Sequence, residues 1–315
     1  MNLSFDVLLN VLIKMLIPVI GGYVVSRADI LTEDYPSKLS HLVLYFSQPF
    51  LLVSSVLGVA HTKENMLSGL TILLLGFLSH GLLAVIAFVI TKPFKDKQTG
   101  RILEHCMLFG NVGFFGIPVV RTIFGDIGAF YAGFFIISFN IVQWSYGVFV
   151  LSRSGKNMSI SVKKIFLNAG TIPCTIGLIL FFSGIKIYAP VLDGMKMIGD
   201  SCTPLSMIIV GSMIARIPIK RLIFKWQPYI VCISKLIIAP VIIGAILSLV
   251  GFSDKFALFG ALMMAFPTAS SSAMFASKYD LQPELAAQTV GLTTVISVIT
   301  VPVIMQAVKF VVNLL

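Results

Sequence analysis

The chain has 315 residues, of which 57% are hydrophobic and only 11% are charged, and its formal net charge is +10. Soluble domains carry about 25% charged residues, so this composition and a mean hydropathy of +0.98 exclude an ordinary soluble protein. No alternating ten-residue strand pattern of a barrel is present, and the chain is therefore expected to be an all-α integral membrane protein. The basic residues lie in short loops between apolar runs, which argues for membrane topology and against nucleic-acid binding.

Ten apolar runs of about 20 residues, the length that crosses a bilayer, follow one another along the chain. They cover residues 4–22, 39–59, 67–91, 101–123, 127–151, 165–184, 191–214, 222–250, 256–276 and 286–311. The first run has neither a basic segment before it nor a small-residue cleavage site after it. We therefore expect it to be a retained span rather than a signal peptide.

Basic residues are concentrated in every second loop. The loops after the odd-numbered runs contain most of the Lys and Arg, for example Lys92, Lys95 and Arg101 after the third run. The loops after the even-numbered runs contain few, such as Lys63 after the second. By the positive-inside rule the first set is cytoplasmic. This predicts a multi-pass protein of the cell (inner) membrane with both termini extracytoplasmic.

The sequence contains no signature of a metal site, a cofactor or an enzyme. All four cysteines lie within apolar runs and without CxxC spacing, so no disulfide framework or metal cluster is predicted. HExxH, GxSxG, GxGxxG and phosphate-loop motifs are absent, and no paired carboxylates are found. We therefore expect no enzymatic activity and no cofactor.

The fourth run collects helix-breaking residues at membrane depth. Gly110, Asn111 and Gly113 lie in its middle, and Gly116 and Pro118 follow. In a helix interior Gly costs about 1 kcal/mol and Pro about 3 kcal/mol relative to Ala, and a bilayer tolerates broken backbone only inside protein or along a polar cavity. One interpretation is two half-helices, the second capped by Asn111, with free N–H groups that form an anion site. The other is a kinked helix whose glycines allow close packing.

Residues of the two halves correspond at an offset of 155 positions. The corresponding pairs are Pro18 and Pro173, Pro49 and Pro204, and His80 and Lys235. Each half holds five runs, and an odd number places the second half upside down in the membrane. Inverted repeats with a discontinuous helix at matching places indicate a secondary-transporter binding site, which favours the half-helix interpretation. The expected organisation is a first five-helix repeat over 1–151, a cytoplasmic linker over 152–164 and a second repeat over 165–315.

The ninth run contains the matching break. Pro267 has no N–H and disrupts a helix. Thr268 and the serines at 270–272 offer hydroxyl groups that could cap a second half-helix, with Thr268 preferred for this role. Small residues that pack helices together are the alternative reading of the serines. If the two breaks cross near the midplane, Asn111 and the segment 268–271 face one polar volume.

With these motifs in view, the chain resembles a known family over essentially its whole length. The motifs are Gly110 to Pro118, Pro204 with Gly211, Phe266-Pro267-Thr268, Phe275 to Asp280, and Thr300-Val301-Pro302. Together and in this order they resemble the auxin efflux carrier family, which includes the plant PIN-FORMED carriers and bacterial relatives.

The resemblance implies a sodium/proton antiporter and bile-acid symporter-like fold, with ten transmembrane helices in two inverted repeats and crossing broken helices 4 and 9. It implies that runs one, two, six and seven form a scaffold and that the other six runs form a mobile domain. Two copies of the protein are expected to form a homodimer through the scaffold. Small organic anions, bound by carboxylate, are the implied substrates. The family's asparagine falls on Asn111 and its second crossover proline on Pro267. Plant members have proline at the position of Gly110, and some have an amide residue at that of Thr268, so this chain departs from them there.

The predicted substrate site combines both breaks with one amide of the fifth run. Its residues are Gly110, Asn111, Val112, Gly113, Pro267, Thr268, Ala269, Ser270 and Asn140. Asn140 is included because an amide can donate to a carboxylate. Further polar residues expected to line the pocket are Gln143, Gln288, Thr293, Thr294 and Ser297.

Ionisable residues at membrane depth indicate function by default. His80 could couple proton movement to transport, and Lys235 could supply positive potential to an anion. Alternatively, His80 bonds a neighbouring run and Lys235 extends to the interface. Among carboxylates, Asp200 is the only one expected deep in a run, while Glu104 near the start of the fourth run gates the path or pairs with Arg101.

The sequence thus predicts a secondary active transporter of small organic anions that works by elevator-type alternating access, by efflux or with proton coupling. Two alternatives stay open. One is a sodium-coupled symporter of the bile-acid type, although a carboxylate cage for sodium is poorly supported. The other is a ligand-binding membrane sensor, which would need a partner for signalling.

Overall fold

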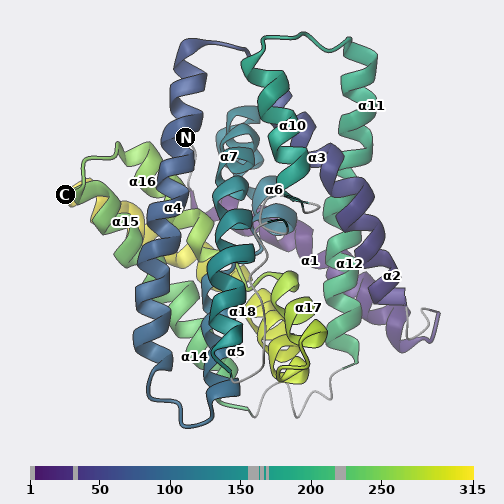
Figure 1. Ribbon diagram of the computed structural model, residues 1–315, viewed down its shortest axis with the longest axis vertical. Coiled ribbons are helices and arrows are strands. Elements are labelled where there is room, and N and C mark those ends of the chain that lie inside the picture. The colour runs from purple at the N-terminus through teal and green to yellow at the C-terminus, as the bar shows by residue number, and fades with distance from the viewer. Residues whose placement is uncertain (1–3, 31–34, 155–162, 164–166, 168–169, 217–224) are drawn as a thin grey trace.

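The computed structural model describes residues 4–30, 35–154, 163, 167, 170–216 and 225–315. All regular elements in these residues are helices, and an isolated antiparallel bridge joins Gly110 to Thr268. The predicted all-α class is confirmed for this part of the chain. Figure 1 shows the helices as an elongated bundle, with shorter helices in its interior.

Seven helical segments of the described chain are long and apolar enough to cross a membrane. They are formed by α1 (Phe5–Arg27); α2 (Tyr35–Leu42), η1 (Val43–Ser47) and α3 (Gln48–Leu57); α4 (Lys63–Thr91); α7 (Asp126–Val142), η3 (Gln143–Gly147) and α8 (Val148–Ser152); α11 (Ala189–Asp200) and α12 (Cys202–Ala215); α14 (Gln227–Ile233), η4 (Ser234–Ile238) and α15 (Ala239–Leu249); and α18 (Pro283–Leu314). The η segments are single π-helical turns within longer helices.

The other three predicted runs coincide with shorter helices. The fourth is divided into α5 (Lys97–Leu108) and a second piece made of η2 (Val112–Gly116) and α6 (Ile117–Phe124). The ninth is divided into α16 (Asp254–Ala265) and α17 (Ser270–Lys278). The sixth contains α10 (Thr171–Phe182), while residues 164–166 and 168–169 at its start lie outside the described residues, as does most of the predicted linker 152–164.

Helix starts in the connecting segments follow ordinary capping chemistry. The carboxylate of Asp96 accepts hydrogen bonds from the N–H groups of Gln98 and Thr99 at 3.1 and 3.3 Å, so α5 begins at Lys97. The Thr99 hydroxyl also donates to this carboxylate and, with the two amides, holds the pKa of Asp96 below its usual value. Thr62 caps α4 in the same way through the N–H of Asn65.

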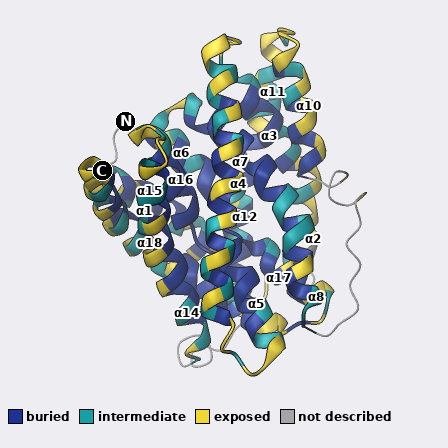
Figure 2. Ribbon diagram, turned by 60° about the vertical axis from the view of Figure 1, so that its left-hand side comes forward, coloured by how far each residue is buried: buried dark blue, intermediate teal, exposed yellow. Residues whose placement is uncertain are grey.

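The outside of the bundle is apolar where a lipid-facing surface requires it. Along α1 the side chains of Ile17, Ile20 and Val24 are 67%, 58% and 57% exposed, whereas Leu8 and Leu12 are fully buried. A membrane helix packs one face against protein and leaves apolar side chains toward lipid on the other. Figure 2 shows the same division between buried and exposed faces on the peripheral helices.

Close backbone contact fixes α1 against α12. At Gly22 a Cβ atom would collide with the backbone of Ile208, whereas at the neighbouring Gly21 no atom lies within 4 Å. Small residues of this kind let membrane helices approach closely and gain dispersion contacts. The α1–α12 pair forms one side of the bundle, and α2, η1 and α12 also contact one another.

Candidate functional site

Both interrupted helices end in extended backbone at the same place in the bundle. α5 ends at Leu108, and Phe109 has φ −107° and ψ 109°. α16 ends at Ala265, and Phe266 has φ −68° and ψ 149°. Pro267 follows, and it cannot donate the hydrogen bond that would continue α16. We call residues 109–111 the first break and residues 266–269 the second break.

The two breaks satisfy each other's backbone groups. The N–H of Asn111 donates to the carbonyl of Pro267 at 2.7 Å, and the N–H of Ala269 donates to the carbonyl of Phe109 at 2.8 Å. This pair of bonds is the antiparallel bridge between Gly110 and Thr268. Away from water, unpaired backbone groups cost several kcal/mol each, so the breaks stabilise one another. The kinked-helix alternative, in which the fourth run continues unbroken, is wrong.

Side chains from two further elements, and that of Thr268 itself, hold the breaks. The N–H of Thr268 donates to Oγ1 of Thr293 in α18 at 3.1 Å, and the Thr268 hydroxyl donates to the carbonyl of Cys106 at 3.0 Å. Nζ of Lys235 in η4 donates to the carbonyl of Met107 at 2.8 Å, and the Lys235 side chain is fully buried. Lys235 therefore does not extend to the interface, which removes that alternative.

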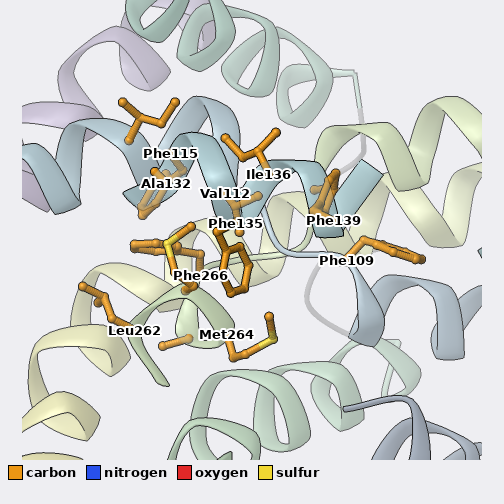
Figure 3. Close-up of a cluster of buried hydrophobic side chains, with 14 of the residues drawn as sticks. Phe109, Val112, Phe115, Ala132, Phe135, Ile136, Phe139, Leu262, Met264 and Phe266 are labelled. Carbon is orange, nitrogen blue, oxygen red and sulfur yellow. The ribbon is translucent and has the colours of Figure 1, made fainter. Parts of the chain in front are cut away.

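An apolar shell surrounds this polar junction. Phe115 of η2 packs edge-on against Phe266 of the second break, with ring centroids 5.8 Å apart. Phe109 packs perpendicular to Phe139 of α7 at 5.5 Å. Figure 3 shows these rings with Phe135 and Met264 in one buried cluster. The shell keeps the junction in a low-dielectric environment, where hydrogen bonds and dipoles act strongly.

Neither predicted side-chain cap is present. Asn111 is the N-cap residue of η2, but its side chain makes no capping hydrogen bond; its carbonyl instead accepts from the N–H groups of Phe115 and Gly116. The N-cap residue of α17 is Ala269, so Thr268 lies one residue too early to cap, and its hydroxyl points back to Cys106. Both capping predictions are wrong because the chain uses these residues to join the breaks.

The free helix amides lie later in the chain than the sequence suggests. The N–H groups of Asn111, Thr268 and Ala269 are occupied at the junction, and Val112 donates to the carbonyl of Gly110 at 2.8 Å. The following amides, at 113 and 114 in η2 and at 270 and 271 in α17, make no recorded hydrogen bond outside their helices among the described residues. First-turn amides have no partner within their own helix, so these four are unpaired in the described structure, and we call them the open amides.

A small cavity lies beside these open amides. Phe114 from η2, with Ser270 and Met274 from α17, forms one wall. The opposite wall comes from the α2–η1 segment and from α12: Ser40, Val43, Leu44, Ser206 and Ile209. Its volume is about 20 Å³, which is room for one water molecule rather than an organic ligand. The cavity thus lies between the starts of the two half-helices on one side and the α2–η1 segment with α12 on the other.

Two buried amide side chains near the first break have unpaired atoms. Nδ2 of Asn111 has no hydrogen-bond partner in the part of the chain described, although Asn111 is only 3% exposed. Oε1 of Gln48 in α3 is also without a partner there, and its Nε2 lies 3.6 Å from the place that a Cβ on Gly113 would occupy. Unsatisfied buried polar atoms are rare and require an explanation. The sequence reasoning missed Gln48, whose only signal is a polar residue before Pro49 in an apolar run.

The predicted polar residues of α7 and η3 divide between two places. Nε2 of Gln143 donates to Oγ of Ser271 at 2.7 Å and so reaches the start of α17. Asn140 lies instead against Gly170, where a Cβ would meet its amide at 2.5 Å, and its Nδ2 is unpaired in the described structure. Within the described residues, no hydrogen bond joins Asn140 to either break.

His80 of α4 lies against Phe109 of the first break. Its Nδ1–H donates to the carbonyl of Gly76, one turn earlier in α4, at 2.7 Å. Its ring contacts Phe109, Phe135 and Phe139, with centroids between 5.3 and 6.3 Å away. The alternative that His80 bonds a neighbouring run is wrong for this nitrogen. Nε2 is buried without a partner among the described residues.

The buried carboxylate is Glu104 and not Asp200. Glu104 is fully buried, pairs with Arg101, and accepts from Arg153 at 3.4 Å. The side chain of Asp200 is 59% exposed and pairs with Arg121 of α6 at 3.1 Å. Asp200 was expected to lie deep in the membrane because of its position within the seventh run. That expectation is wrong, because Asp200 ends α11 at the bundle surface. No group of three metal-ligating side chains is found in the residues that the structure describes.

A multi-pass helical membrane protein with two interrupted helices meeting at one point has the construction of a membrane transport protein. The comparisons identify the family: the model of the membrane transport protein family, the auxin efflux carrier family, matches residues 7–305, and the chain belongs to it.

Two archaeal proteins are similar over their full lengths. An uncharacterized transporter of Methanocaldococcus jannaschii is 26% identical over 312 residues, which are 95% of this chain and 97% of that protein. An uncharacterized transporter of Methanothermobacter thermautotrophicus is 23% identical over 309 residues, covering 95% and 96% of the two chains. The membership in a transporter family agrees with the expectation that the chain is not an enzyme.

Proposed function

We propose that this protein is a secondary active transporter of small organic anions, and that it binds their carboxylate at the junction of the two breaks. One observation carries the proposal: the open amides at 113–114 and at 270–271 begin two half-helices beside the same small cavity. A helix N-terminus carries about half a positive elementary charge and presents unpaired N–H groups. Two such ends at one point favour an anion over a neutral or cationic solute.

Asn111 and Gln48 are the side chains proposed to complete the site. The unpaired Nδ2 of Asn111 offers a donor to a carboxylate oxygen. Gln48 faces Gly113 from the opposite helix and can turn either end of its amide toward a ligand. Gly110 lies close to the support residues, because a Cβ there would be in van der Waals contact with Nζ of Lys235 and the Met263 carbonyl, both at 3.4 Å.

The other predicted site residues are proposed to have different roles. Val112, Pro267, Thr268 and Ala269 hold the backbone of the breaks, whereas Gly113 and Ser270 present amides to the ligand. Asn140 remains a proposed contact for the substrate's distal end, on the side of α7 that meets Gly170. No metal ligand or cofactor is part of the proposed mechanism.

A cavity of about 20 Å³ cannot hold an organic acid, so transport requires the breaks to separate from the α2–η1 segment and α12. We propose that this separation is an elevator movement. The scaffold would comprise α1, the segment α2–η1–α3, α10 and α11–α12, and would join two copies as a homodimer. The inverted five-helix repeats, 1–151 and 165–315, would place the breaks at the bilayer midplane.

Lys235 and His80 are proposed to support the site and to link it to protons. The Lys235 ammonium is held at the carbonyl of Met107, two residues before the first break, where its charge favours an anion. His80 contacts Phe109 of the break and keeps one unpaired nitrogen for a proton. The proposed location is the cell membrane, with the basic loops cytoplasmic and both termini outside.

The test uses purified protein and defined solutes. A thermal-shift screen with acetate, malonate, succinate and benzoate should raise the unfolding temperature for at least one of them. Flux of that acid into liposomes should then be saturable and should change when a proton gradient is imposed. Flux that needs sodium would favour the bile-acid-type symporter instead, and binding without any flux would favour the membrane sensor.

A further inference from the structure

A second cavity lies between α4 and the segment formed by the end of α7 and η3. Its volume is about 400 Å³, within the range of small-molecule sites. One wall is a stripe along α4 and the other comes from the end of α7 and from η3: Phe77, His80, Gly81, Ala84, Val85, Phe88, Val142 and Tyr146. We call it the α4 groove. Apart from His80 and Tyr146, its lining side chains are apolar.

The α4 groove opens toward the lipid phase. Val85 is 63% exposed and Phe77 is 37% exposed, although both lie in a helix that crosses the membrane. Figure 1 shows α4 at the front of the bundle along most of its length. Gly81 and Ala84 lack long side chains, and a Cβ on Gly81 would meet no atom within 4 Å. The space is therefore open at the centre of the stripe.

The length of the groove matches one leaflet of a bilayer. From Phe77 to Phe88 the helix rises about 17 Å at 1.5 Å per residue. Half of a hydrocarbon core of about 30 Å is about 15 Å. An extended acyl chain of one leaflet thus has the length of this groove.

A cationic cluster lies at the Phe88 end. The guanidinium of Arg153 lies over the Phe88 ring, 5.1 Å from its centroid, and its side chain is 27% exposed. Tyr146, at the same end, interacts with the carboxylate of Glu104. Glu104 pairs with both Arg101 and Arg153, so two guanidinium groups share one carboxylate and one positive charge is left. Lys92, at the end of α4, is exposed nearby in the chain.

We propose that the α4 groove binds an anionic phospholipid, with one acyl chain along α4 and the phosphate at Arg153. The groove supplies apolar area for the chain, and Arg forms bidentate hydrogen bonds with phosphate. Basic pockets beside transmembrane helices bind acidic headgroups in this way. His80 and Tyr146 are the polar residues among the lining of the groove. This inference does not depend on the substrate.

Native mass spectrometry of delipidated protein in detergent tests the site. Phosphatidylglycerol and phosphatidylcholine with identical chains serve as the two probes. We expect one retained phosphatidylglycerol per chain, with a preference of about fivefold over phosphatidylcholine from one arginine. Equal retention of both lipids would overturn the proposed headgroup contact at Arg153.

Variants locate the bound lipid. Gly81→Leu fills the groove without a clash, and we expect it to reduce the retained lipid at least tenfold. Gly21→Leu is the matched control, since Gly21 is also an exposed helix glycine with open space around it, and it should retain lipid as the wild type does. Ala84→Leu is a second groove-filling change in case the first disturbs folding. Unchanged phosphatidylglycerol retention by both groove variants would refute the site.

Arg153→Gln separates the headgroup from the chain. The change leaves Glu104 paired with Arg101, and an elution volume equal to that of the wild type checks that the variant is folded. We expect this variant to bind both lipids with the affinity of phosphatidylcholine. A preserved preference for phosphatidylglycerol would place the headgroup elsewhere and contradict the proposal.

Discussion

Asn111→Ala removes a buried amide whose Nδ2 donates to no acceptor in the described part of the chain. The backbone bond from Asn111 to Pro267 at 2.7 Å is unaffected by this change, so the junction of the breaks stays intact. Because no side-chain hydrogen bond of Nδ2 is lost, the free energy of unfolding should fall by less than about 1 kcal/mol. The substitution therefore isolates ligand binding from folding.

The expected loss of affinity follows from the bond that the ligand would make. A hydrogen bond to a charged group contributes about 1.5–3 kcal/mol, and each 1.4 kcal/mol is a factor of about ten in the dissociation constant. We therefore expect Asn111→Ala to weaken binding of a carboxylate by about 10- to 150-fold. Asn111→Asp keeps the size of the side chain but opposes the anion, and it should abolish binding.

Isothermal titration with the strongest acid of the screen measures this loss directly. Gln227→Ala is the matched control: Oε1 of Gln227 is likewise buried without a described partner, but it lies at the start of α14, outside the site. That control should bind with wild-type affinity. If Asn111→Ala also bound with wild-type affinity while remaining folded, the assignment of Asn111 to the site would be refuted.

Three further substitutions test other parts of the structure. Lys235→Met leaves the Met107 carbonyl unpaired and should cost about 1–3 kcal/mol, seen as a lower unfolding temperature; an unchanged temperature would contradict the bond. Gly22→Leu should prevent stable folding because its side chain meets the Ile208 backbone, whereas the control Gly21→Leu should fold. Equal yields of folded protein from the two variants would refute the close α1–α12 contact. The Arg121–Asp200 ion pair joins α6 to α11 at the surface, so Asp200→Asn should change flux by less than about fivefold. High salt, which screens the pair, should have the same effect on flux by the wild type. A larger change in flux would show that Asp200 has a role beyond a surface ion pair.

The positions of both breaks were predictable because they depend on local chemistry. Gly110 and Pro267 lower helix stability wherever they occur in a span, and the repeat at 155 residues indicated that the two breaks belong together. The structure places them within hydrogen-bond distance. Local sequence and internal symmetry therefore predicted the junction.

The hydrogen bonds at the junction were not predictable. Asn111 and Thr268 have the composition of caps, but a backbone bridge between two distant segments uses their amides first. Such pairing depends on the relative position of the helices, which no single segment encodes. The open amides were consequently expected one or two residues too early.

Burial also depended on elements far apart in the chain. Glu104 is buried with its charge paired, and one of its partners, Arg153, lies 49 residues later in the chain. Gln48 is a candidate site residue only because α3 places its side chain opposite Gly113. The pair of Glu104 with Arg101 was one of two expectations from the sequence, whereas the contact of Glu104 with Arg153 and the place of Gln48 depend on the tertiary structure.

Selection by charge tests the central claim most directly. Liposomes with purified protein would take up a labelled carboxylate in competition with the same unlabelled acid or with its uncharged amide. If two helix N-termini and Asn111 bind a negative group, the acid should compete at least tenfold better than the amide. Equal competition by the two compounds, or uptake only of neutral or cationic solutes, would contradict an anion site at the junction of the breaks.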